Sequence, residues 1–282
     1  MNTFTIENPY LRARITNNGA CLLSLEDLKF SSPVLRPWVE TELWHPGESA
    51  MFPMLPFANR ISGNAFSLQN NIHTLPANMF NDPYYIHGNG WLTLWDVQVT
   101  ADDRITFCTY PCELSGYKYH AEITYTLQDE QFLADVIVTH LGETPMPYGL
   151  GFHPFFMTLP ESTIQFLTTG YWSEDENHLA NEWFEDIPEE INFSSPLCSR
   201  GTWINNCYSG WNGLAVISHP GRKVVLRSDT PWLMVYQNKS EEFICLEPQT
   251  HQVDAYNLPG RPGLRMLKKG DSFKLKMAIG IY

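Results

Sequence analysis

Alternating apolar and polar residues dominate this chain and predict β-strands along most of its length. The clearest run lies near the C-terminus, where apolar residues occupy every second position from Phe273 to Ile281. A period of two directs one set of side chains toward a core and the other set away from it. Residues 4–7, 11–15 and 124–141 show the same alternation.

Turn-forming sequences separate these runs at short spacing: Asn17-Asn18-Gly19, Asp102-Asp103, Gln128-Asp129-Glu130, His219-Pro220-Gly221 and Leu258-Pro259-Gly260. No segment keeps a helical period for three turns, although residues 174–184 are expected to form one or two short helices. Many short strands without helical crossovers predict an all-β fold, specifically a large antiparallel β-sandwich. Because no linker or repeat interrupts the chain, we expect residues 1–282 to form a single domain.

The amino-acid composition limits the classes of molecule that the protein is expected to bind. The chain has 18 Lys and Arg against 31 Asp and Glu, a formal net charge of -13, which argues against nucleic acid and anionic membranes as partners. The N-terminus lacks a basic region followed by an apolar run, and no stretch approaches the roughly 20 apolar residues that span a bilayer. The spacing of the 6 cysteines matches no redox or zinc pair. We therefore expect a cytoplasmic protein; its oligomeric state is not predicted.

Residues 243–250 place a carboxylate in an otherwise apolar strand. In an extended segment, Glu247 shares a face with Phe243 and Cys245, and the residues between them are apolar as well. Pro248 keeps Glu247 out of helical geometry and removes a ladder donor, so the strand is expected to end at about this position. Burial raises the pKa of a carboxyl group, which suits a general base. The alternative is that Glu247 only accepts backbone hydrogen bonds at a strand end.

Other polar residues also lie among apolar neighbours. Asn59 and Arg60 sit between apolar runs, where the guanidinium requires a partner, either a structural carboxylate or sugar hydroxyls. His87 follows aromatic residues and precedes two glycines, which allow a ligand to approach the backbone or simply form a turn. His153 has apolar and aromatic neighbours, and Pro154 keeps it extended. Each histidine alone could be structural, but three such features in one chain favour a functional site.

Other chemistries have little support in the sequence. A Gly-x-Ser-x-Gly elbow and a His-Glu-x-x-His motif are both absent, so we predict no metal site; one would have to be assembled from distant residues. Asp254, seven positions after Glu247, could supply the second carboxylate of a glycosidase, but nothing marks it as buried.

Four short motifs occur along the chain in a fixed order: Asn59-Arg60-Ile61, His87-Gly88, Gly-Phe-His-Pro-Phe-Phe at 151–156 and Glu-Pro-Gln-Thr at 247–250. Together they resemble the aldose 1-epimerase (galactose mutarotase) family over essentially the whole chain. Within that family the chain looks most similar to bacterial mutarotase-like proteins of unassigned substrate. The resemblance implies a large antiparallel β-sandwich that holds a small-molecule sugar on its open face and needs no cofactor.

The resemblance also implies roles for individual residues. Glu247 would take the proton from the anomeric hydroxyl and His153 would protonate the ring oxygen, so that the ring opens and recloses as the other anomer. Arg60 and His87 would hold hydroxyl groups. The chemistry suits these residue types, because anomer exchange needs one proton removed and one donated at two oxygens on the same carbon.

Two positions depart from the family pattern. Asn205 stands where the family usually has an aspartate that binds a sugar hydroxyl, and an amide is a weaker acceptor than a carboxylate. Trp91 stands where many relatives have a basic or smaller residue, and it either stacks on the sugar or fills the core. Three functions therefore stay open: a mutarotase for a free aldose, a hexose-6-phosphate 1-epimerase, and a sugar-binding protein without turnover.

Overall fold

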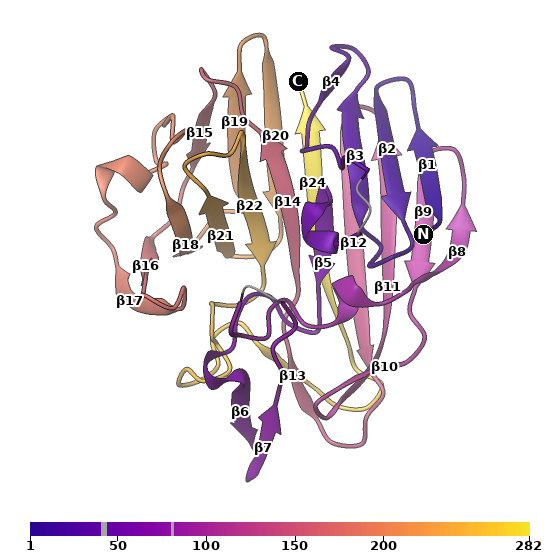
Figure 1. Ribbon diagram of the computed structural model, residues 1–282, viewed down its shortest axis with the longest axis vertical. Helices are drawn as coiled ribbons and strands as arrows, with labels where there is room; N and C mark the ends of the chain where they lie inside the picture. The colour runs from indigo at the N-terminus through magenta and orange to yellow at the C-terminus, as the bar shows by residue number, and fades with distance from the viewer. Residues whose placement is uncertain (41–43, 80–81) are drawn as a thin grey trace.

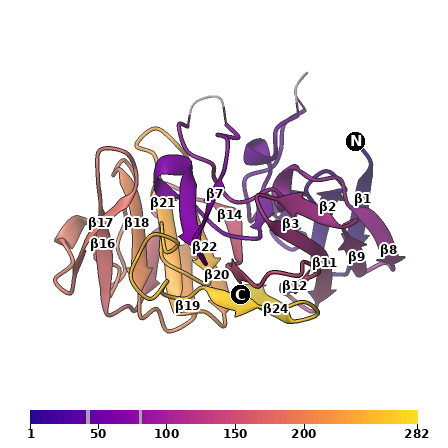
Figure 2. The ribbon, with the colours of Figure 1, turned by 90° about the horizontal axis from the view of Figure 1, so that it is seen from below.

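The computed structural model describes residues 1–40, 44–79 and 82–282, and these are built largely of β-strands (Figure 1). Seen from below, the strands form two layers (Figure 2), which are an eleven-stranded and a nine-stranded sheet. Neighbouring strands in both sheets pair antiparallel. The predicted all-β, antiparallel sandwich is therefore confirmed.

The eleven-stranded sheet carries the site described below. Its strands are, in spatial order, β1 (Thr3–Glu7), β2 (Leu11–Thr16), β3 (Leu22–Asp27), β5 (Met51–Met54), β14 (Gly151–Met157), β22 (Phe243–Gln249), β21 (Trp232–Gln237), β18 (Ile204–Ser209), β16 (Gly170–Glu174) and β17 (Ala180–Phe184), with β4 (Ser32–Pro33) beside β3.

The nine-stranded sheet closes the core from the other side. Its strands are β15 (Thr163–Phe166), β19 (Leu214–His219), β20 (Arg222–Ser228), β24 (Ser272–Ile281), β12 (Gln131–His140), β11 (Tyr117–Gln128), β9 (Arg104–Cys108) and β8 (Asp96–Thr100), with β10 (Cys112–Leu114) beside β11. Smaller elements are the pairs β13 (Met146–Tyr148) with β23 (Arg265–Leu267) and β6 (Ala65–Leu68) with β7 (Asn71–Thr74), and the 3-10 turns η1 (Pro46–Glu48), η2 (Ser62–Asn64), η3 (Gly90–Leu92) and η4 (Glu189–Ile191).

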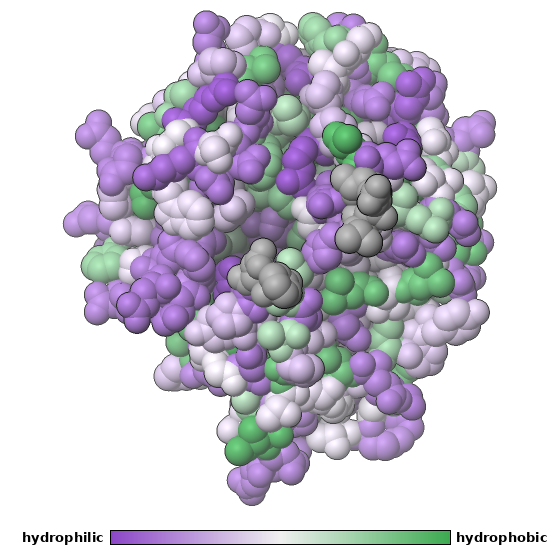
Figure 3. Space-filling view, viewed as in Figure 1, coloured by the Kyte–Doolittle hydropathy of each residue, from purple (hydrophilic) through white to green (hydrophobic). Residues whose placement is uncertain are grey.

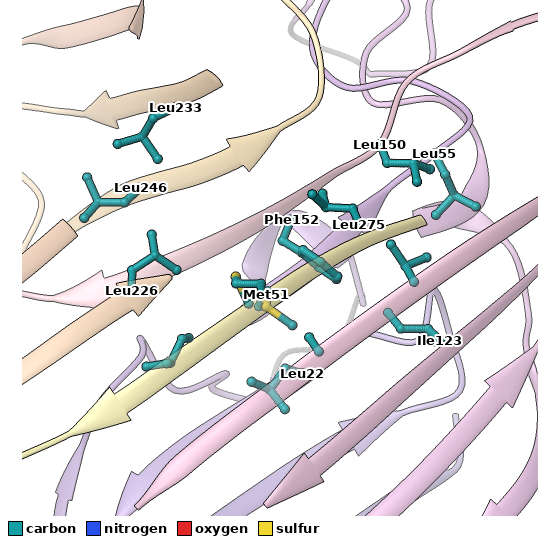
Figure 4. Packing of buried hydrophobic residues seen from close by; sticks show 14 of the residues in the cluster. Leu22, Met51, Leu55, Ile123, Leu150, Phe152, Leu226, Leu233, Leu246 and Leu275 are labelled. Carbon is teal, nitrogen blue, oxygen red and sulfur yellow. The ribbon is translucent and has the colours of Figure 1, made fainter. Parts of the chain in front are cut away.

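Alternation along the strands produces the core between the sheets. In β24 the apolar residues from Phe273 to Ile281 are buried at every second position, as the sequence pattern predicts. Phe152 and Leu246 point inward from the eleven-stranded sheet and meet side chains such as Leu275 from the other sheet (Figure 4). The opposite, outer face of β14 and β22 is therefore free to carry polar groups.

One local prediction is wrong. Residues 174–184 form the β16–β17 hairpin rather than short helices, because Asp175 Oδ1 accepts hydrogen bonds from the backbone of Asn177 and Leu179 and closes a turn between the strands. The expected end of the strand near Pro248 is confirmed, because β22 ends at Gln249, which still pairs with β14 and β21. A proline favours extended backbone, so neighbouring strands on both sides can hold it within the sheet.

All six cysteines are free. Among the described residues, no helix has the length and apolar character required to cross a membrane.

Candidate active site

A cavity of about 570 Å³ opens on the outer face of the eleven-stranded sheet. Figure 3 shows a hollow near the centre of this face. Side chains from β5, β14, β22, β21 and β18 form its floor and one wall, and the segments around residues 59 and 87 border the other side. All seven residues that the sequence marked as candidates line it: Asn59, Arg60, His87, Trp91, His153, Asn205 and Glu247.

Strand register sets His153 directly opposite Glu247. Gly151 pairs with Gln249 and Phe155 pairs with Cys245, so the residues midway between these pairs face each other. His153 Nε2 lies 3.2 Å from Glu247 Oε1. The pairing of two adjacent antiparallel strands thus aligns an imidazole with a carboxyl group at the floor of the cavity.

Aromatic rings fix the orientation of His153. Its imidazole stacks on Phe52, at 4.5 Å, and on Phe155, at 4.6 Å, and the guanidinium of Arg36 lies over the Phe155 ring, 3.8 Å from its centre. Burial, aided by the charge of Arg36, lowers the pKa of His153 to about 3. His153 Nδ1 is buried and has no partner among the described residues.

Glu247 is only 2% exposed, and within the described part of the chain its Oε1 makes a close polar contact with His153 Nε2. Its Oε2 is buried without a hydrogen-bond partner in the described part of the chain. Burial raises the pKa of Glu247 well above its usual range, although the charge of Arg60 acts in the opposite direction. A carboxyl group kept this short of partners is suited to exchanging a proton with a ligand.

The backbone fixes the tautomer of His87. Its Nδ1 accepts a hydrogen bond from the N–H of Asn59 at 3.1 Å, so a neutral ring carries its proton on Nε2 as a donor. Burial, followed by the charges of His153 and Arg60, lowers the pKa of His87 well below its usual value. Gly88 follows with φ +65°, where an added Cβ would lie 2.2 Å from the carbonyl oxygen of Leu55. The His-Gly motif therefore reflects a close backbone approach.

Arg60 forms an ion pair while it lines the cavity. Both Nε, at 2.8 Å, and an outer nitrogen, at 2.7 Å, contact Asp82 Oδ2, and both side chains are mostly buried. The two alternatives for Arg60, a structural pair and a place in the ligand site, are therefore compatible.

Asp254, the alternative second carboxylate, accepts hydrogen bonds from the Ser62 backbone and from Asn257 and is not among the residues lining this cavity.

Trp91 is 2% exposed and packs into the cavity floor. Its indole stacks on Phe52 with 4.7 Å between ring centres, and its Nε1 donates to the carbonyl oxygen of Gly88 at 3.0 Å. The indole thus supports the ring that stacks on His153. Stacking of Trp91 on a sugar stays a prediction.

The wall beyond β21 contains residues that the sequence analysis missed. Asn205 on β18 donates through Nδ2 to Glu174 on β16, and Glu174 also accepts from Trp203 Nε1 at 2.8 Å and pairs with His178 Nδ1. Asn205, Trp203 and His178 line the cavity, and Glu174 lies behind them. Assigning residues 174–184 to helices concealed this group, because it is the β16–β17 hairpin that brings Glu174 and His178 to Asn205.

Among the described residues, one group of side chains has metal-ligand geometry. The ligand atoms of His153, Cys245 and Glu247 lie within 4.8 Å of one another. Burial raises the pKa of the Cys245 thiol well above its usual value, so this sulfur would have to lose a proton against its surroundings before it could bind a metal. These donors fit a proton-exchange site better than a metal site.

A second hollow, of about 790 Å³, lies beside Tyr256, Arg261 and Met266. Of the residues that the structure describes, neither a carboxyl group nor an imidazole lines this hollow. The combination of acid, base and hydrogen-bonding groups occurs in the cavity over β14 and β22, which is therefore the candidate active site.

Comparisons with known proteins agree with the fold. A family model described as aldose 1-epimerase matches residues 2–280. YphB, an uncharacterized protein of Escherichia coli K12, is 30% identical over 292 residues, which cover 100% of this chain and 99% of YphB. A crystal structure from Escherichia coli K12, provisionally named an aldose 1-epimerase, has a TM-score of 0.93 and 29% identity and covers 100% of this chain and 99% of its own. A galactose mutarotase-like protein from Lactobacillus casei has the same fold, with a TM-score of 0.82, 19% identity and full coverage of both chains. The chain therefore belongs to the aldose 1-epimerase family.

Proposed function

We propose that this protein is a mutarotase that interconverts the α and β anomers of an unphosphorylated aldose. The observation that carries the proposal is the His153–Glu247 pair, with 3.2 Å between Nε2 and Oε1, at the floor of a cavity of sugar-accommodating size. Membership of the aldose 1-epimerase family supports the reaction class.

The reaction assigns opposite tasks to the two groups. Glu247 removes the proton from the anomeric hydroxyl while protonated His153 donates to the ring oxygen, and the bond between C1 and the ring oxygen breaks to leave an aldehyde and a free hydroxyl. Rotation about the C1–C2 bond exposes the other face of the aldehyde. Closure with the two roles reversed gives the other anomer and restores both groups, so the net change in protons is zero.

Burial makes the Glu247 carboxylate a stronger base and protonated His153 a stronger acid. A carboxylate whose pKa is raised is a stronger base, and an imidazolium whose pKa is lowered is a stronger acid. Either group alone would seldom be charged in this environment, but the pair can share one proton across their contact. The sugar gives one proton to Glu247 and takes one from His153. The net charge of the pair is therefore the same before and after ring opening.

The surrounding residues would bind and orient the sugar. His87 offers its Nε2 proton to a sugar oxygen, and Arg60 offers the guanidinium edge that Asp82 does not occupy. Asn59 holds His87 through backbone hydrogen bonds, Asn205 provides an amide on the far wall, and Trp91 supports the aromatic floor. These assignments extend the family resemblance to the contacts of this chain.

Charge disfavours a phosphorylated substrate. Among the described residues that line the cavity, Arg60 is the sole Arg or Lys, and Asp82 already pairs with it. Glu176 and Glu247 add further acidic groups to the lining. A dianionic phosphate would lack a free cation here and would meet carboxylates instead.

The test measures how quickly freshly dissolved α-glucose and α-galactose equilibrate, by polarimetry or proton NMR, with wild type and with Glu247→Gln. We expect wild type to outpace buffer and Glu247→Gln to lose about 10²–10⁴-fold of that acceleration, because a general base is removed. Glu122→Gln, on the outer face of the other sheet, is the matched control and should retain the wild-type rate. Wild type that fails to beat buffer across a panel of aldoses, while circular dichroism reports a folded chain, would contradict the proposal.

A further inference from the structure

The amide of Asn205 is held in one orientation from behind the cavity. Its Nδ2 donates to Glu174 Oε1, and a carboxylate oxygen next to the amide must face the nitrogen, since facing the amide oxygen would oppose two negative atoms. Asn205 Oδ1 therefore points away from Glu174. In the part of the chain that the structure describes, no donor reaches Oδ1, and this atom is not among the buried polar atoms that lack partners.

Glu174 is arranged to hold this wall. Its side chain is 16% exposed, it does not line the cavity itself, and its two oxygens contact three side chains that do. Trp203 Nε1 and the Asn205 amide are donors, and His178 Nδ1 must also carry a hydrogen, because a carboxylate offers acceptors alone. All three donors are therefore engaged by Glu174, on the side of these residues that faces away from the cavity.

From these contacts we infer that Glu174 is a positioning residue for substrate recognition, which turns Asn205 so that its carbonyl oxygen accepts a hydrogen bond from a sugar hydroxyl. The inference rests on the proposed function. The acceptor that a carboxylate at position 205 would supply comes instead from an amide, and the negative charge is moved one strand away, from β18 to β16. The group recognised is a sugar hydroxyl that donates a hydrogen bond to Asn205. This hydroxyl is not one of the two oxygens that exchange protons with His153 and Glu247.

The hydrogen-bonded pair of Asn205 and Glu174 has a donor at one position and an acceptor at the other. The amide and the carboxylate can therefore be exchanged between the two positions. In Asn205→Asp alone, two carboxylates would be in contact, and in Glu174→Gln alone the amide at 205 would lose its charged acceptor. In the double variant Glu174→Gln/Asn205→Asp, the new amide donates to the new carboxylate, its oxygen can still accept from Trp203, and His178 can accept through its other tautomer. An acceptor again faces the sugar.

The experiment is a double-mutant cycle on the dissociation constant of the preferred aldose, measured by tryptophan fluorescence, together with KM and kcat for mutarotation. Each single variant should raise Kd and KM about 5- to 10-fold, the loss expected for one hydrogen bond between neutral groups. Values of kcat should stay within about 3-fold, because the interaction holds substrate and transition state alike. The double variant should recover to within about 3-fold of wild type. Glu182→Gln, which removes the same charge from β17 outside the cavity lining, is the control and should leave all values unchanged.

The inference would be overturned if the increases in Kd of the two single variants multiplied in the double variant. It would also be overturned if Glu174→Gln left Kd unchanged. If Asn205→Asp does not fold, the Asn205 side-chain amide signals in ¹⁵N NMR decide the matter: they should shift in ligand-free Glu174→Gln, and unshifted signals would overturn it. Wild type that binds aldoses without accelerating mutarotation would refute the proposed function while the Kd cycle still tests Glu174. Absence of any aldose binding would refute both.

Discussion

At the scale of single residues, burial favours the uncharged forms of His153 and Glu247, a state in which the pair holds one proton. Burial disfavours the carboxylate and the imidazolium, so the pKa of Glu247 is raised and that of His153 is lowered to about 3. A second proton joins the pair as pH falls toward the lower value, and the last proton leaves as pH rises through the raised carboxyl pKa. We therefore expect the single-proton state to extend across the range in which a solvent-exposed histidine titrates.

The resulting prediction concerns the pH profile. The enzymatic part of kcat/KM for mutarotation should stay level as pH is lowered from 6.5 to 5, because a lowered imidazole pKa and a raised carboxyl pKa are expected to leave one proton on the pair throughout this range. Polarimetry at each pH, with the buffer rate subtracted and folding checked by circular dichroism, measures it. A decline centred on the ordinary histidine value would show that an unshifted imidazole controls the reaction.

At the scale of elements, one histidine ties the end of β22 to the segment that supplies Asn59. His251 Nε2 accepts from the N–H of Ala58 at 3.0 Å, and its Nδ1 donates to the carbonyl oxygen of Gln252 at 2.7 Å. Gly149, just before β14, makes room for the ring: an added Cβ would lie 2.0 Å from His251 Cδ2. Three separate chain segments thus meet beside the cavity at one imidazole.

We expect Gly149→Ala to lower the free energy of unfolding by about 1–3 kcal/mol, because the methyl group overlaps a buried ring that cannot move without losing two hydrogen bonds. Urea unfolding measures the change. His251→Ala provides the matched test of mechanism: once the ring is absent, adding Gly149→Ala should change stability little. Equal effects of Gly149→Ala with and without the imidazole would assign the loss to the backbone instead.

At the scale of the whole molecule, four buried histidines link folding to pH. Burial lowers the pKa values of His219 and His251 to about 4 and that of His153 to about 3, and that of His87 is also well below 6.5. An unfolded chain binds these protons near pH 6.5, so it holds more protons than the folded chain below that pH. Glu247 acts in the opposite direction above its usual pKa, but it is one group against four.

Stability should therefore fall as pH drops from 7 to 5, by on the order of 1–2 kcal/mol for each of these histidines, partly offset by Glu247. Urea unfolding at successive pH values measures the slope. His219→Asn can keep the hydrogen bond that His219 Nδ1 makes with Ser162 Oγ but cannot titrate, so it should flatten the slope. Stability that is independent of pH over this range would contradict the linkage.

The sequence alone predicted the sandwich from local patterns, and it predicted the residues that line the cavity from local patterns together with the family resemblance. A period of two specifies which side chains of β24 enter the core, whatever strand lies beside it. Glu247 and His153 could be identified because charge or titratable groups within apolar strands, each followed by proline, are unusual in any fold. Single-domain organisation and the roles of these residues remain predictions.

Only the tertiary structure decided which residues face each other across strands. Strand register aligns His153 with Glu247, and the β16–β17 hairpin carries Glu174 to Asn205, although 31 positions separate them in the sequence. Residues 174–184 are polar and short of apolar alternation, so local propensity gave no reason to expect a strand there, whereas pairing between β16 and β17 supplies one. Side-chain contacts between strands are set by pairing, and pairing is a property of the assembled sheet.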